Sequence, residues 1–500
     1  MKVKWDVSEP APSASPRFEP IDRQQIVLEP LDVERLIEET HPARHIWAIL
    51  GRLDLSRFLG EVKAVEGRAG RNSWEPRLLI AMWIYAYSRG ISSAREIERQ
   101  CAYEPGLRWL TGLKKVNHHT LSDFRVGHGE ALQSLFVQVL GILTMEKLVT
   151  LERVTVDGTK VRACVNKKTF SRAQKIQEHL KVARAHVEAM QQEEAEQERR
   201  GRHAAAQRRA AREQVERLEA ALKEVERLQT EKKWERDKPC QASTTDADAQ
   251  FMHTSDHGLA PSYNVQLTAD AKNKLVIDVA VSKQPSDSIH LLPALDRIQQ
   301  CLHTYPQQAV ADGDYTTREA VVGAAGRGVD YYGSWKGADQ ERMGHGIAAE
   351  YHPGAFEYDE RANEMICPLG ERLVFQTVQQ RTGGLEVYIY AADAEVCRGC
   401  SERQRCSPQN AMERQGRAVS VAVEPAVVER YHAKMATEVG KAIYKERAPV
   451  AEFPHAWLKD KLNWVRMRCR GIAKTQCEAL WVCLTYNLQR YFKLSQVQPA

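Results

Sequence analysis

The sequence predicts an α/β protein in which a mixed sheet follows a helical N-terminal region. Apolar residues recur with helical spacing up to residue 148, and from residue 152 they alternate with polar residues as in a half-buried strand. Strand-like and helix-like segments then follow one another as far as residue 335, which is the order of an α/β layout. With 500 residues, 43% of them hydrophobic and 27% charged, the chain is long enough for two or three domains with cores.

The first part of the chain divides into a leader and a helical domain. Residues 1–23 are rich in Pro and Ser and are predicted to be a mobile leader. Residues 24–148 form the predicted helical domain, in which 74–90 indicates a largely buried helix. Pro76 suits its first turn, where a backbone N–H has no helical partner in any case, and Gly90 ends it.

Two pairs of residues in this domain have the spacing of a capping box. In such a box a Ser or Thr side chain and an acidic residue three positions later satisfy N–H groups at the start of a helix. The pairs are Ser93 with Glu96 and Thr120 with Asp123. Each pair predicts a helix that begins just after its first residue.

Arg95 and Arg99 lie on the helix that the first of these pairs begins, one short turn after the helix at 74–90. A helix, a short turn and a second, basic helix resemble a helix-turn-helix DNA reader. An ordinary helical bundle with solvated arginines explains the same pattern equally well. Both interpretations stay open, and Arg95 and Arg99 are candidate DNA contacts.

The predicted sheet domain consists of residues 149–335 and 421–495. In its first strand, at 152–161, Val154 and Val156 share one face and Asp157 lies on the other. Further strands are predicted at 263–269, 275–283, 308–312 and 329–335, with helices at 288–302, at 317–328 and from about 424 to 494.

Two stretches interrupt this domain. Residues 171–238 are rich in Glu, Arg, Ala, Gln and Lys and contain no Pro, and their apolar positions at helical spacing include Val182, Leu218 and Val225. They predict an inserted helical hairpin or coiled coil. Residues 336–420 show no regular pattern and form a predicted Cys-rich insertion.

Four of the eleven cysteines gather in that insertion. They are Cys367, Cys397, Cys400 and Cys406. Four thiolates that include a C-x₂-C pair can enclose Zn²⁺ tetrahedrally, so the cluster is a candidate structural zinc site. Reduced thiols are an equally good explanation, because the spacings differ from those of a standard zinc ribbon, and disulfides rank behind both.

Two aspartates give the first indication of chemistry. Asp157 and Asp312 are each predicted to end a strand, and each precedes a glycine. Two carboxylates at strand ends can share divalent cations with a phosphodiester, because Mg²⁺ prefers hard oxygen ligands. Asp314 competes with Asp312 for this role, and a single aspartate is more often a turn residue. A polar loop near the site is more simply a solvated loop; its residues are Asp246, Asp248, Asp256 and His257.

A third carboxylate lies in the segment KAIYKERAPVAEFPHAWLKDK. Tyr444, Arg447, Glu452 and Lys459 in this segment resemble the Tyr-Arg-Glu-Lys signature of a large group of DDE transposases of bacterial insertion sequences. The interval from Glu452 to Lys459 matches the signature, whereas the interval from Arg447 to Glu452 is one residue longer than in the best-known members. The similarity is collinear from residue 30 to 494 and includes SWEPRLLIAMWIYAYSRG, VTVDGTKVRA, PSYNVQLTAD and ADGDY.

This resemblance implies an RNase H-like catalytic domain in which Asp157, Asp312 and Glu452 hold two Mg²⁺ or Mn²⁺ ions. The implied reaction is hydrolysis of one DNA strand at each end of the element, followed by attack of the freed 3′-hydroxyl on target DNA. Glu452 rather than Glu446 is the implied catalytic glutamate. The implied DNA contacts near the cleavage site are Tyr444, Arg447 and Lys459. Helix surface with one packed tyrosine is the alternative for these three residues.

The same resemblance implies double-stranded DNA as the partner, both the terminal inverted repeats of the element and the target. It also implies a homodimer on that DNA, because two ends must be brought together. No segment reaches the roughly 18 uncharged apolar residues of a membrane span, so a cytoplasmic, nucleoid-associated bacterial protein without membrane contact is expected. The formal net charge of +5 permits a nucleic-acid partner without requiring one.

Two other classes of function stay open. A catalytically inactive, transposase-derived DNA-binding repressor would keep the helical domain, but it would have no physical reason to keep three acidic positions. A coiled-coil scaffold would depend on residues 171–238. Removing that stretch should leave the catalytic fold intact under the transposase hypothesis and destroy the function under the scaffold hypothesis.

Overall fold

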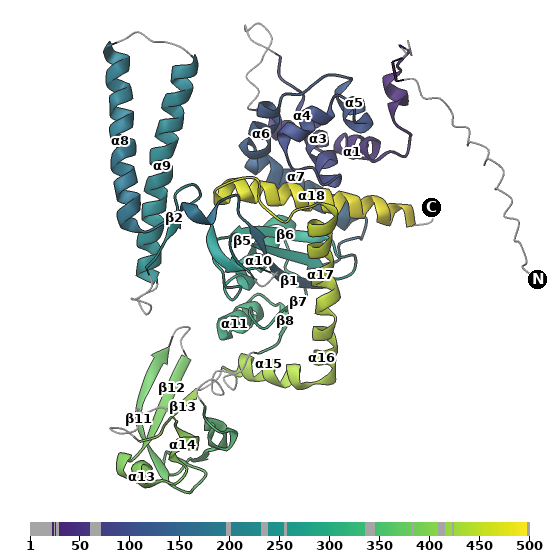
Figure 1. The fold of residues 1–500 in the computed structure, drawn as a ribbon. Helices are drawn as coiled ribbons and strands as arrows, with labels where there is room; N and C mark the ends of the chain where they lie inside the picture. Colours follow the sequence, from purple (N-terminus) through teal and green to yellow (C-terminus); the bar gives the residue numbers. More distant parts are fainter. Residues whose placement is uncertain are drawn as a thin grey trace, which may run out of the picture.

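The structure, a computed structural model, describes most of the chain. The described residues are 23, 24, 26, 30–60, 72–196, 202–231, 239–254, 258–335, 346–381, 385–408, 416–422 and 425–497. The predicted leader lies outside them apart from Arg23, as do Asp256 and His257 of the polar loop. The described part forms three tiers, a helical domain, a central sheet and a smaller sheet, with a long helical hairpin to one side (Figure 1).

The N-terminal helices form the first tier. They are η1 (Val33–Leu36), α1 (Pro42–Leu50), α2 (Ser56–Leu59), α3 (Pro76–Ser88), α4 (Ala94–Gln100), α5 (Pro105–Thr111), α6 (His118–Gly127) and α7 (Gly129–Met145). α3 is the central helix, and nearly all its side chains are buried, as the sequence predicts. Its Trp83 Nε1 donates a hydrogen bond to Leu121 O of α6 at 3.0 Å, which joins the two helices.

The two predicted capping boxes differ in outcome. Ser93 Oγ accepts a hydrogen bond from Glu96 N at 3.4 Å, so the predicted start of α4 is confirmed. The second prediction is wrong, because Asn117 Oδ1 accepts from His119 N at 2.7 Å and caps α6 three residues before Thr120. Thr120 therefore lies inside α6, where its backbone is already helical.

The central sheet is mixed. Its strands are β1 (Arg153–Arg162), β4 (Gln250–His253), β5 (Leu259–Asp270), β6 (Val276–Ser282), β7 (Gln308–Ala311) and β8 (Asp330–Gly333). They lie in the order β4-β5-β1-β7-β8, with β6 also paired to β5. β5 is antiparallel to β1, β4 and β6, whereas β7 is parallel to both β1 and β8. The predicted mixed sheet after a helical region is confirmed.

Helices connect the strands and then close the domain. The elements are α10 (Leu291–Leu302), α11 (Arg318–Gly326), α15 (Ala426–Ala436), α16 (Glu438–Lys445), α17 (Arg447–Ala456), the π-helical turn η6 (Trp457–Lys461) and α18 (Ile472–Val497). α18 lies between the helical domain and the central sheet, where it contacts α3, α7 and β6 (Figure 1). One continuous hydrophobic core therefore joins the first two tiers.

α18 also completes the hydrogen bonding of the edge strand β6. Asn487 Oδ1 accepts from Val276 N at 2.9 Å, and Asn487 Nδ2 donates to Val276 O at 2.7 Å. Val281 N donates to Gln476 Oε1 at 2.7 Å, and Gln476 Nε2 donates to Val279 O at 2.9 Å. Because an edge strand presents unpaired N–H and C=O groups, these two amides take the place of a further strand.

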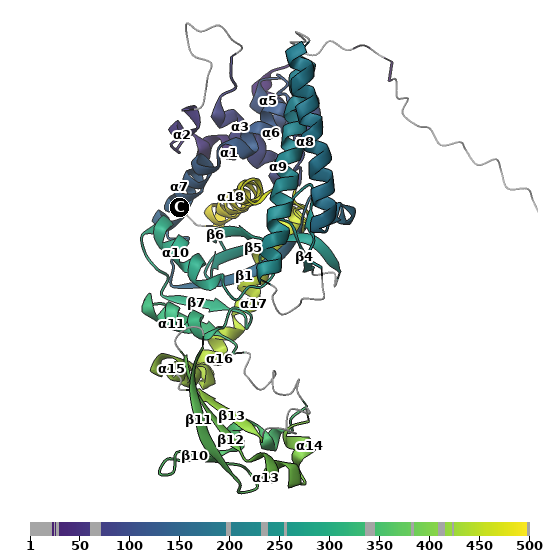
Figure 2. The ribbon, with the colours of Figure 1, turned by 90° about the vertical axis from the view of Figure 1, so that its left-hand side faces the viewer.

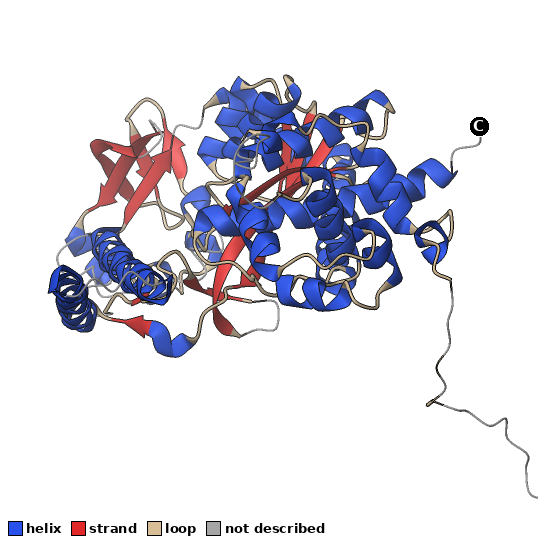
Figure 3. Ribbon diagram, turned by 90° about the horizontal axis from the view of Figure 1, so that it is seen from above, coloured by secondary structure: helices blue, strands red, loops and turns tan. Residues whose placement is uncertain are grey.

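The stretch that interrupts the central sheet contains a two-helix hairpin. Its helices are α8 (Ala173–Glu196) and α9 (Arg202–Glu231), and its root is the short pair β2 (Phe170–Ser171) and β3 (Ala242–Ser243). Figure 3, which looks down on the molecule, shows the two helices side by side and apart from the helical domain. Ile176 and Leu180 pack against Leu218 and Val225, whereas Val182 is 71% exposed, so its predicted place on the apolar side is wrong.

The third tier is a separate antiparallel sheet (Figure 2). Its elements are β9 (Glu357–Asp359), β10 (Glu364–Ile366), β11 (Arg372–Arg381), β12 (Leu385–Ala392), β13 (Ala418–Ala422), α13 (Ala394–Gly399) and α14 (Arg403–Cys406), preceded by the 3₁₀ turns η3 (Ala349–Tyr351) and η4 (Pro353–Ala355). A small core of its own includes Phe356, Leu373 and Tyr390. Among the described helices of the whole chain, none is long and apolar enough to cross a membrane.

Asn487→Leu should destabilise the protein. The change keeps the volume similar but leaves Val276 N and Val276 O buried without partners, at a cost of about 1–3 kcal/mol for each group. We expect a lower thermal midpoint by calorimetry. Gln476→Leu should cost less because Gln476 is only half-buried and water can reach the groups it leaves. Equal midpoints for wild type and Asn487→Leu would show that the amide does not support β6.

Candidate active site

Asp157 lies in the middle of β1, so the prediction that it ends a strand is wrong. The strand continues because β5 stays paired with β1 from Val154 to Arg162. What ends near Asp157 is the ladder between β1 and β7, whose last pair is Val156 with Ala311. Asp157 is therefore the first residue of β1 beyond that ladder.

Asp312 holds the matching position on the neighbouring strand. β7 ends at Ala311, which is the partner of Val156. Asp312 comes directly after Ala311, just as Asp157 comes directly after Val156. Because the pairing is parallel and in register, the two aspartates lie side by side on strands about 4.8 Å apart. The sequence suggested this pair, and the structure brings its members together.

Asp312 is half-buried and sits among other charges. Burial raises the pKa of its carboxyl, and the carboxylates of Asp314 and Asp157 raise it further. A hydrogen bond from Asp314 N to Asp312 Oδ1, 2.8 Å long, acts in the opposite direction, as does Arg447. The Asp314 side chain is exposed. Of the two competing aspartates, Asp312 is thus the one that shares a site with Asp157.

α17 covers Asp157 with two basic side chains. His455 Nε2 lies 3.3 Å from Asp157 Oδ2, and Arg447 Nη1 lies 3.9 Å from Asp157 Oδ1. His455 is 9% exposed, and its Nδ1 is buried without a hydrogen-bond partner in the part of the chain that the structure describes. Each oxygen of the Asp157 carboxylate therefore faces one cationic or potentially cationic group of the same helix.

His455 is the site residue that the sequence analysis missed. Its spacing is the only feature of the sequence that indicates a role in the site. On a helix, a residue three positions after Glu452 and four positions before Lys459 lies on the same side as both of them. A histidine next to Pro454 also reads as an ordinary core residue, so the pattern alone does not single it out. Its closeness to Asp157 requires the packing of α17 on β1.

Glu452 lies one turn before His455 on α17, and its side chain is exposed. Residues three apart on a helix have Cβ atoms about 5–6 Å from each other, so Glu452 starts close to the residue that contacts Asp157. The ion pairs of Asp157 nevertheless involve Arg447 and His455. The third predicted ligand thus lies one helical turn from a residue that contacts Asp157, and its side chain is exposed.

Tyr444 and Lys459 flank this arrangement. The guanidinium of Arg447 lies 5.9 Å from the centre of the Tyr444 ring, across the break between α16 and α17. Lys459, in η6, is half-buried; burial lowers the pKa of its ammonium group, while Asp157 and Asp460 counteract that effect. The predicted DNA contacts Arg447 and Lys459 therefore lie within the electrostatic reach of Asp157.

The opposite face of β1 fixes the strand in place. Gly158 points there, and a Cβ at this position would lie 2.7 Å from both Asp287 Oδ1 and Gln266 Nε2. Asp287 also accepts from Lys160 Nζ at 3.0 Å and from Asn264 Nδ2 at 2.6 Å. Glycine is needed next to Asp157 because this polar network leaves no room for a side chain.

Arg95 and Arg99 lie on α4 in the first tier, away from the aspartate pair (Figure 1). Both side chains are exposed. Arg99 Nε donates to Glu96 Oε2 at 2.7 Å, and its guanidinium lies 5.3 Å from the centre of the Tyr103 ring. The structure thus places both arginines at the surface of the helical domain and pairs one of them within its own helix.

The polar loop at 246–248 is not solvated as the simpler interpretation predicted. Asp246 is 4% exposed and accepts from Tyr263 OH at 2.7 Å and from Gly471 N at 3.1 Å. Asp248 Oδ2 accepts from Ile472 N at 3.0 Å and so caps the start of α18. Both aspartates turn inward because the first N–H groups of α18 have no acceptor within the helix and need one from elsewhere.

The four clustered cysteines surround one small cavity of about 50 Å³ in the third tier. All eleven cysteines are unbridged, including Cys367, Cys397, Cys400 and Cys406. Burial raises the pKa of the Cys406 thiol, and the three other sulfurs of the cluster raise it further. Glu371 N and Arg417 N each donate to a sulfur at 3.3 Å, those of Cys367 and Cys397.

Within the described residues, no group of three or more His, Cys, Asp or Glu side chains is already arranged to hold a metal ion. Asp157 and Asp312 nonetheless suit a divalent cation chemically. They offer hard oxygen atoms on adjacent strands, and burial, with the nearby charges of Asp314 and Asp157, raises the pKa of Asp312. Glu452 is the nearest further candidate ligand by its place on α17.

Two family models match the chain. A transposase domain (DUF772) matches residues 31–126, which span the helices of the first tier from η1 into α6. A transposase DDE domain matches residues 366–492, which span strands β11 to β13 of the third tier and the helix that carries Arg447, Glu452 and His455. Both matches are to transposase domains, and they make the chain similar to DDE transposases of the insertion-sequence type. The two aspartates lie between the matched segments, so they rest on the geometry described above.

Further comparisons add little to that assignment. No curated protein matches the chain. One solved structure that does match is described as "Cryo-EM structure of piggyBac transposase synaptic complex with hairpin DNA (SNHP)". It has 9% sequence identity and a TM-score of 0.23, and the match covers 94% of this chain and 82% of that one. A superposition at that level supports no argument about fold or mechanism.

Replacing His455 should weaken the aspartate site without unfolding α17. We expect His455→Ala to lower any divalent-metal-dependent activity about 10–100-fold, the usual effect of removing a group that orients a ligand. His455→Gln, which keeps a hydrogen-bonding group at a similar reach, should recover part of the loss. The measurement is activity against Mg²⁺ concentration. Curves for His455→Ala that overlay those of wild type would exclude a role in the site.

Proposed function

We propose that this chain is a DDE transposase that cleaves DNA at the ends of an insertion sequence and joins the freed ends to target DNA. The observation that carries the proposal is the aspartate pair at the end of the β1–β7 ladder, beneath a helix with a glutamate and basic residues. The strand order β6-β5-β1-β7-β8, whose first two neighbouring pairs are antiparallel and whose last two are parallel, supports an RNase H-like catalytic domain. Fold alone would not define the activity.

Asp157, Asp312 and Glu452 are the residues proposed to hold Mg²⁺ or Mn²⁺. When bound, two such ions supply activation of the attacking oxygen and stabilisation of the leaving one. The protein contributes the carboxylates, two of them on a rigid sheet. Glu452 is suited to complete the set because its carboxylate is exposed and lies one helical turn from the residue that touches Asp157.

Arg447 and Lys459 are proposed to bind DNA phosphates beside the scissile bond. Both side chains lie near Asp157, and a guanidinium suits a phosphate because it presents parallel N–H donors. The half-buried Lys459 offers a point charge in a partly desolvated place. Tyr444 is proposed as the third contact, at the entrance formed by the break before α17.

The DNA partners are proposed to be the terminal inverted repeats and the target, bound by a homodimer. The helical domain is the proposed reader of the repeats, through Arg95 and Arg99 on the exposed face of α4. It packs on α18, and α18 packs on β6, so DNA held there has a fixed direction relative to the aspartates. An inactive DNA-binding repressor is the second candidate, and strand cleavage separates it from the first.

Asp157→Ala, Asp312→Ala and Glu452→Ala should each abolish cleavage of DNA that carries the element's own ends, with DNA binding retained. The reason is loss of a proposed metal ligand, and the measurement is Mg²⁺- or Mn²⁺-dependent strand cleavage on gels beside a binding assay. Asp314→Ala is the matched control and should stay active, because Asp314 lies two residues beyond the position that is in register with Asp157. Light scattering on the same complexes reports whether two chains are present.

Either of two results would count against the triad. An inactive Asp314→Ala beside an active Asp312→Ala would move the second ligand by two residues. Binding of the ends by wild type without any cleavage, at every Mg²⁺ or Mn²⁺ concentration, would favour the repressor.

The cysteine cluster is proposed to hold one structural Zn²⁺ ion. Four thiols that face a single small cavity, two of them already accepting backbone N–H bonds, match the surroundings of a thiolate zinc site. Elemental analysis of purified protein should find about one zinc per chain. Cys397→Ser should lose it, and Cys301→Ser, outside the cluster, should keep it. Zinc-free protein from zinc-supplemented cells would leave reduced thiols as the explanation.

A further inference from the structure

The turn between α3 and α4 is held by two arginines from other parts of the chain. Ser92, in that turn, is 7% exposed. Its backbone O accepts a hydrogen bond from Arg125 Nη1 of α6 at 2.9 Å, and its Oγ accepts from Arg468 Nε at 3.0 Å. Ser93, the next residue, caps α4 with its own side chain. The start of the proposed DNA-reading helix is thus bonded to a residue 376 positions further along the chain.

Arg468 belongs to residues 462–471, which connect η6 to α18 and are called the joining segment below. Glu478 of α18, whose side chain is buried, holds this segment from within. Its carboxylate accepts from Trp464 Nε1 at 3.2 Å. It also accepts from Arg468 N and Cys469 N, each at 2.9 Å. Because a buried carboxylate is costly unless N–H donors surround it, these bonds fix the backbone at Arg468 independently of its side chain.

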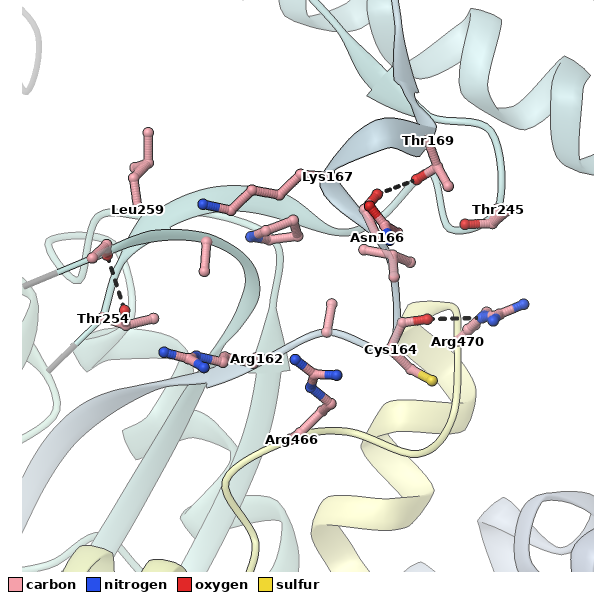
Figure 4. A pocket seen from close by; sticks show the side chains of 15 residues that line it. Arg162, Cys164, Asn166, Lys167, Thr169, Thr245, Thr254, Leu259, Arg466 and Arg470 are labelled. Carbon is pink, nitrogen blue, oxygen red and sulfur yellow. Dashed lines mark hydrogen bonds between the residues drawn. The ribbon is translucent and has the colours of Figure 1, made fainter. Parts of the chain in front are cut away.

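The joining segment is also bonded to the strand of the active site. Met467 N donates to Arg162 O, in the last residue of β1, at 2.8 Å. Arg470 Nε donates to Cys164 O, just beyond that strand, at 3.0 Å (Figure 4). The strand that carries Asp157 and the turn before α4 are therefore bonded to one and the same segment.

The end of α3 reaches η6 by a second route. Gln489 of α18 accepts from Trp457 Nε1 at 2.9 Å, and its Nε2 donates to Ser88 O at 3.4 Å. A Cβ at Gly90, where φ is +72°, would lie 3.4 Å from Asn463 Cβ. Trp457 is the first residue of η6, the turn that carries the proposed phosphate contact. The helical domain and the catalytic segment thus meet in one hydrogen-bonded joint, which consists of residues 88–93 and the joining segment.

We infer that Arg468 is a positioning residue for the proposed strand cleavage. Its bond to Ser92 fixes the direction of α4, and of DNA bound there, relative to Asp157. The inference rests on the proposed function. Successive phosphates of one strand are only about 3.4 Å apart along the DNA axis, so a small shift of α4 would bring the neighbouring bond to the aspartates. A misplacement of about 1 Å is already enough to lower a rate about 100-fold.

The test is a double-mutant cycle on the full chain, with duplex DNA that carries the element's end. Arg468→Ala and Ser92→Ala each remove one partner of the side-chain bond and keep the backbone bonds to Arg125 and Glu478. Each should lower the rate of Mg²⁺-dependent cleavage at saturating DNA by about 2- to 30-fold, the range in which residues between two sites alter their coupling. The double variant should be no slower than the slower single variant, because both changes remove the same bond.

Two further variants separate positioning from a general loss. Arg468→Lys, which keeps a donor on a long side chain, should recover part of the rate. Arg466→Ala removes an exposed arginine whose side chain lines a cavity at the end of β1 (Figure 4), so its effect should add to that of Ser92→Ala. The affinity of Arg468→Ala for the DNA end and its thermal midpoint should stay close to those of wild type, because Glu478 still holds the backbone.

Tolerance to spacing is the readout that a merely structural role would not move. One base pair is inserted at successive positions inward from the cleaved bond. At the positions where wild type loses most of its cleavage, Arg468→Ala and Ser92→Ala should lose a smaller fraction of theirs. Equal fractional losses in all three proteins would overturn the inference, as would additive effects of the two changes. Weaker DNA binding by Arg468→Ala alone would also overturn it, because Arg468 would then contact the DNA directly.

These outcomes are separable from a failure of the proposed function. Wild type is first assayed for Mg²⁺-dependent cleavage of the same duplex. If it cuts the ends and the cycle is additive, only the role of Arg468 is wrong. If wild type does not cut the ends, the proposed function fails, and the inference fails with it.

Discussion

The in-register parallel pairing of β1 with β7 is the constraint on which the candidate active site depends. It ends at Val156 and Ala311, and so it sets Asp157 and Asp312 next to each other on neighbouring strands. Burial raises the pKa of the Asp312 carboxyl, and repulsion from the carboxylates of Asp314 and Asp157 raises it further. The sheet can hold them because β1 is paired on both sides and is fixed from behind by Gly158 against Asp287. A loop would relax by moving the two charges apart.

The sheet in turn depends on α18 for its edge and for its place in the molecule. Its amides at Gln476 and Asn487 pair with β6, and Trp481 Nε1 on the same helix donates to Arg125 O at 3.0 Å in the helical domain. The N-terminal cap of α18 comes from Asp248, beside the root of the hairpin. One helix therefore connects the helical domain, the sheet and the hairpin root. This explains how segments far apart in sequence form a single core.

Local pattern predicted the elements well and their surroundings poorly. The alternation at 152–161 located β1, but the length of β5, which keeps β1 a strand past Asp157, is not visible in that segment. Asp246 lies in a polar stretch and is nevertheless buried, because Gly471, 225 residues away, donates to it. Both aspartates of the site could be proposed from sequence. His455 could not, because its role depends on a contact between α17 and β1, whose proximity only the fold defines.

The contacts of Asp157 also bear on how α17 is positioned. The two carboxylate oxygens of Asp157 face Arg447 and His455, which are two turns apart on α17. The carboxylate therefore attracts both ends of α17 towards β1. At an effective dielectric constant of about 20, a pair of unit charges about 4 Å apart interacts by about 4 kcal/mol, enough to influence the seating of a short helix. Glu452 lies between these two residues. Its position relative to the aspartates therefore depends on the charge at Asp157, which makes Asp157 both a proposed ligand and the anchor of the helix that carries the third carboxylate.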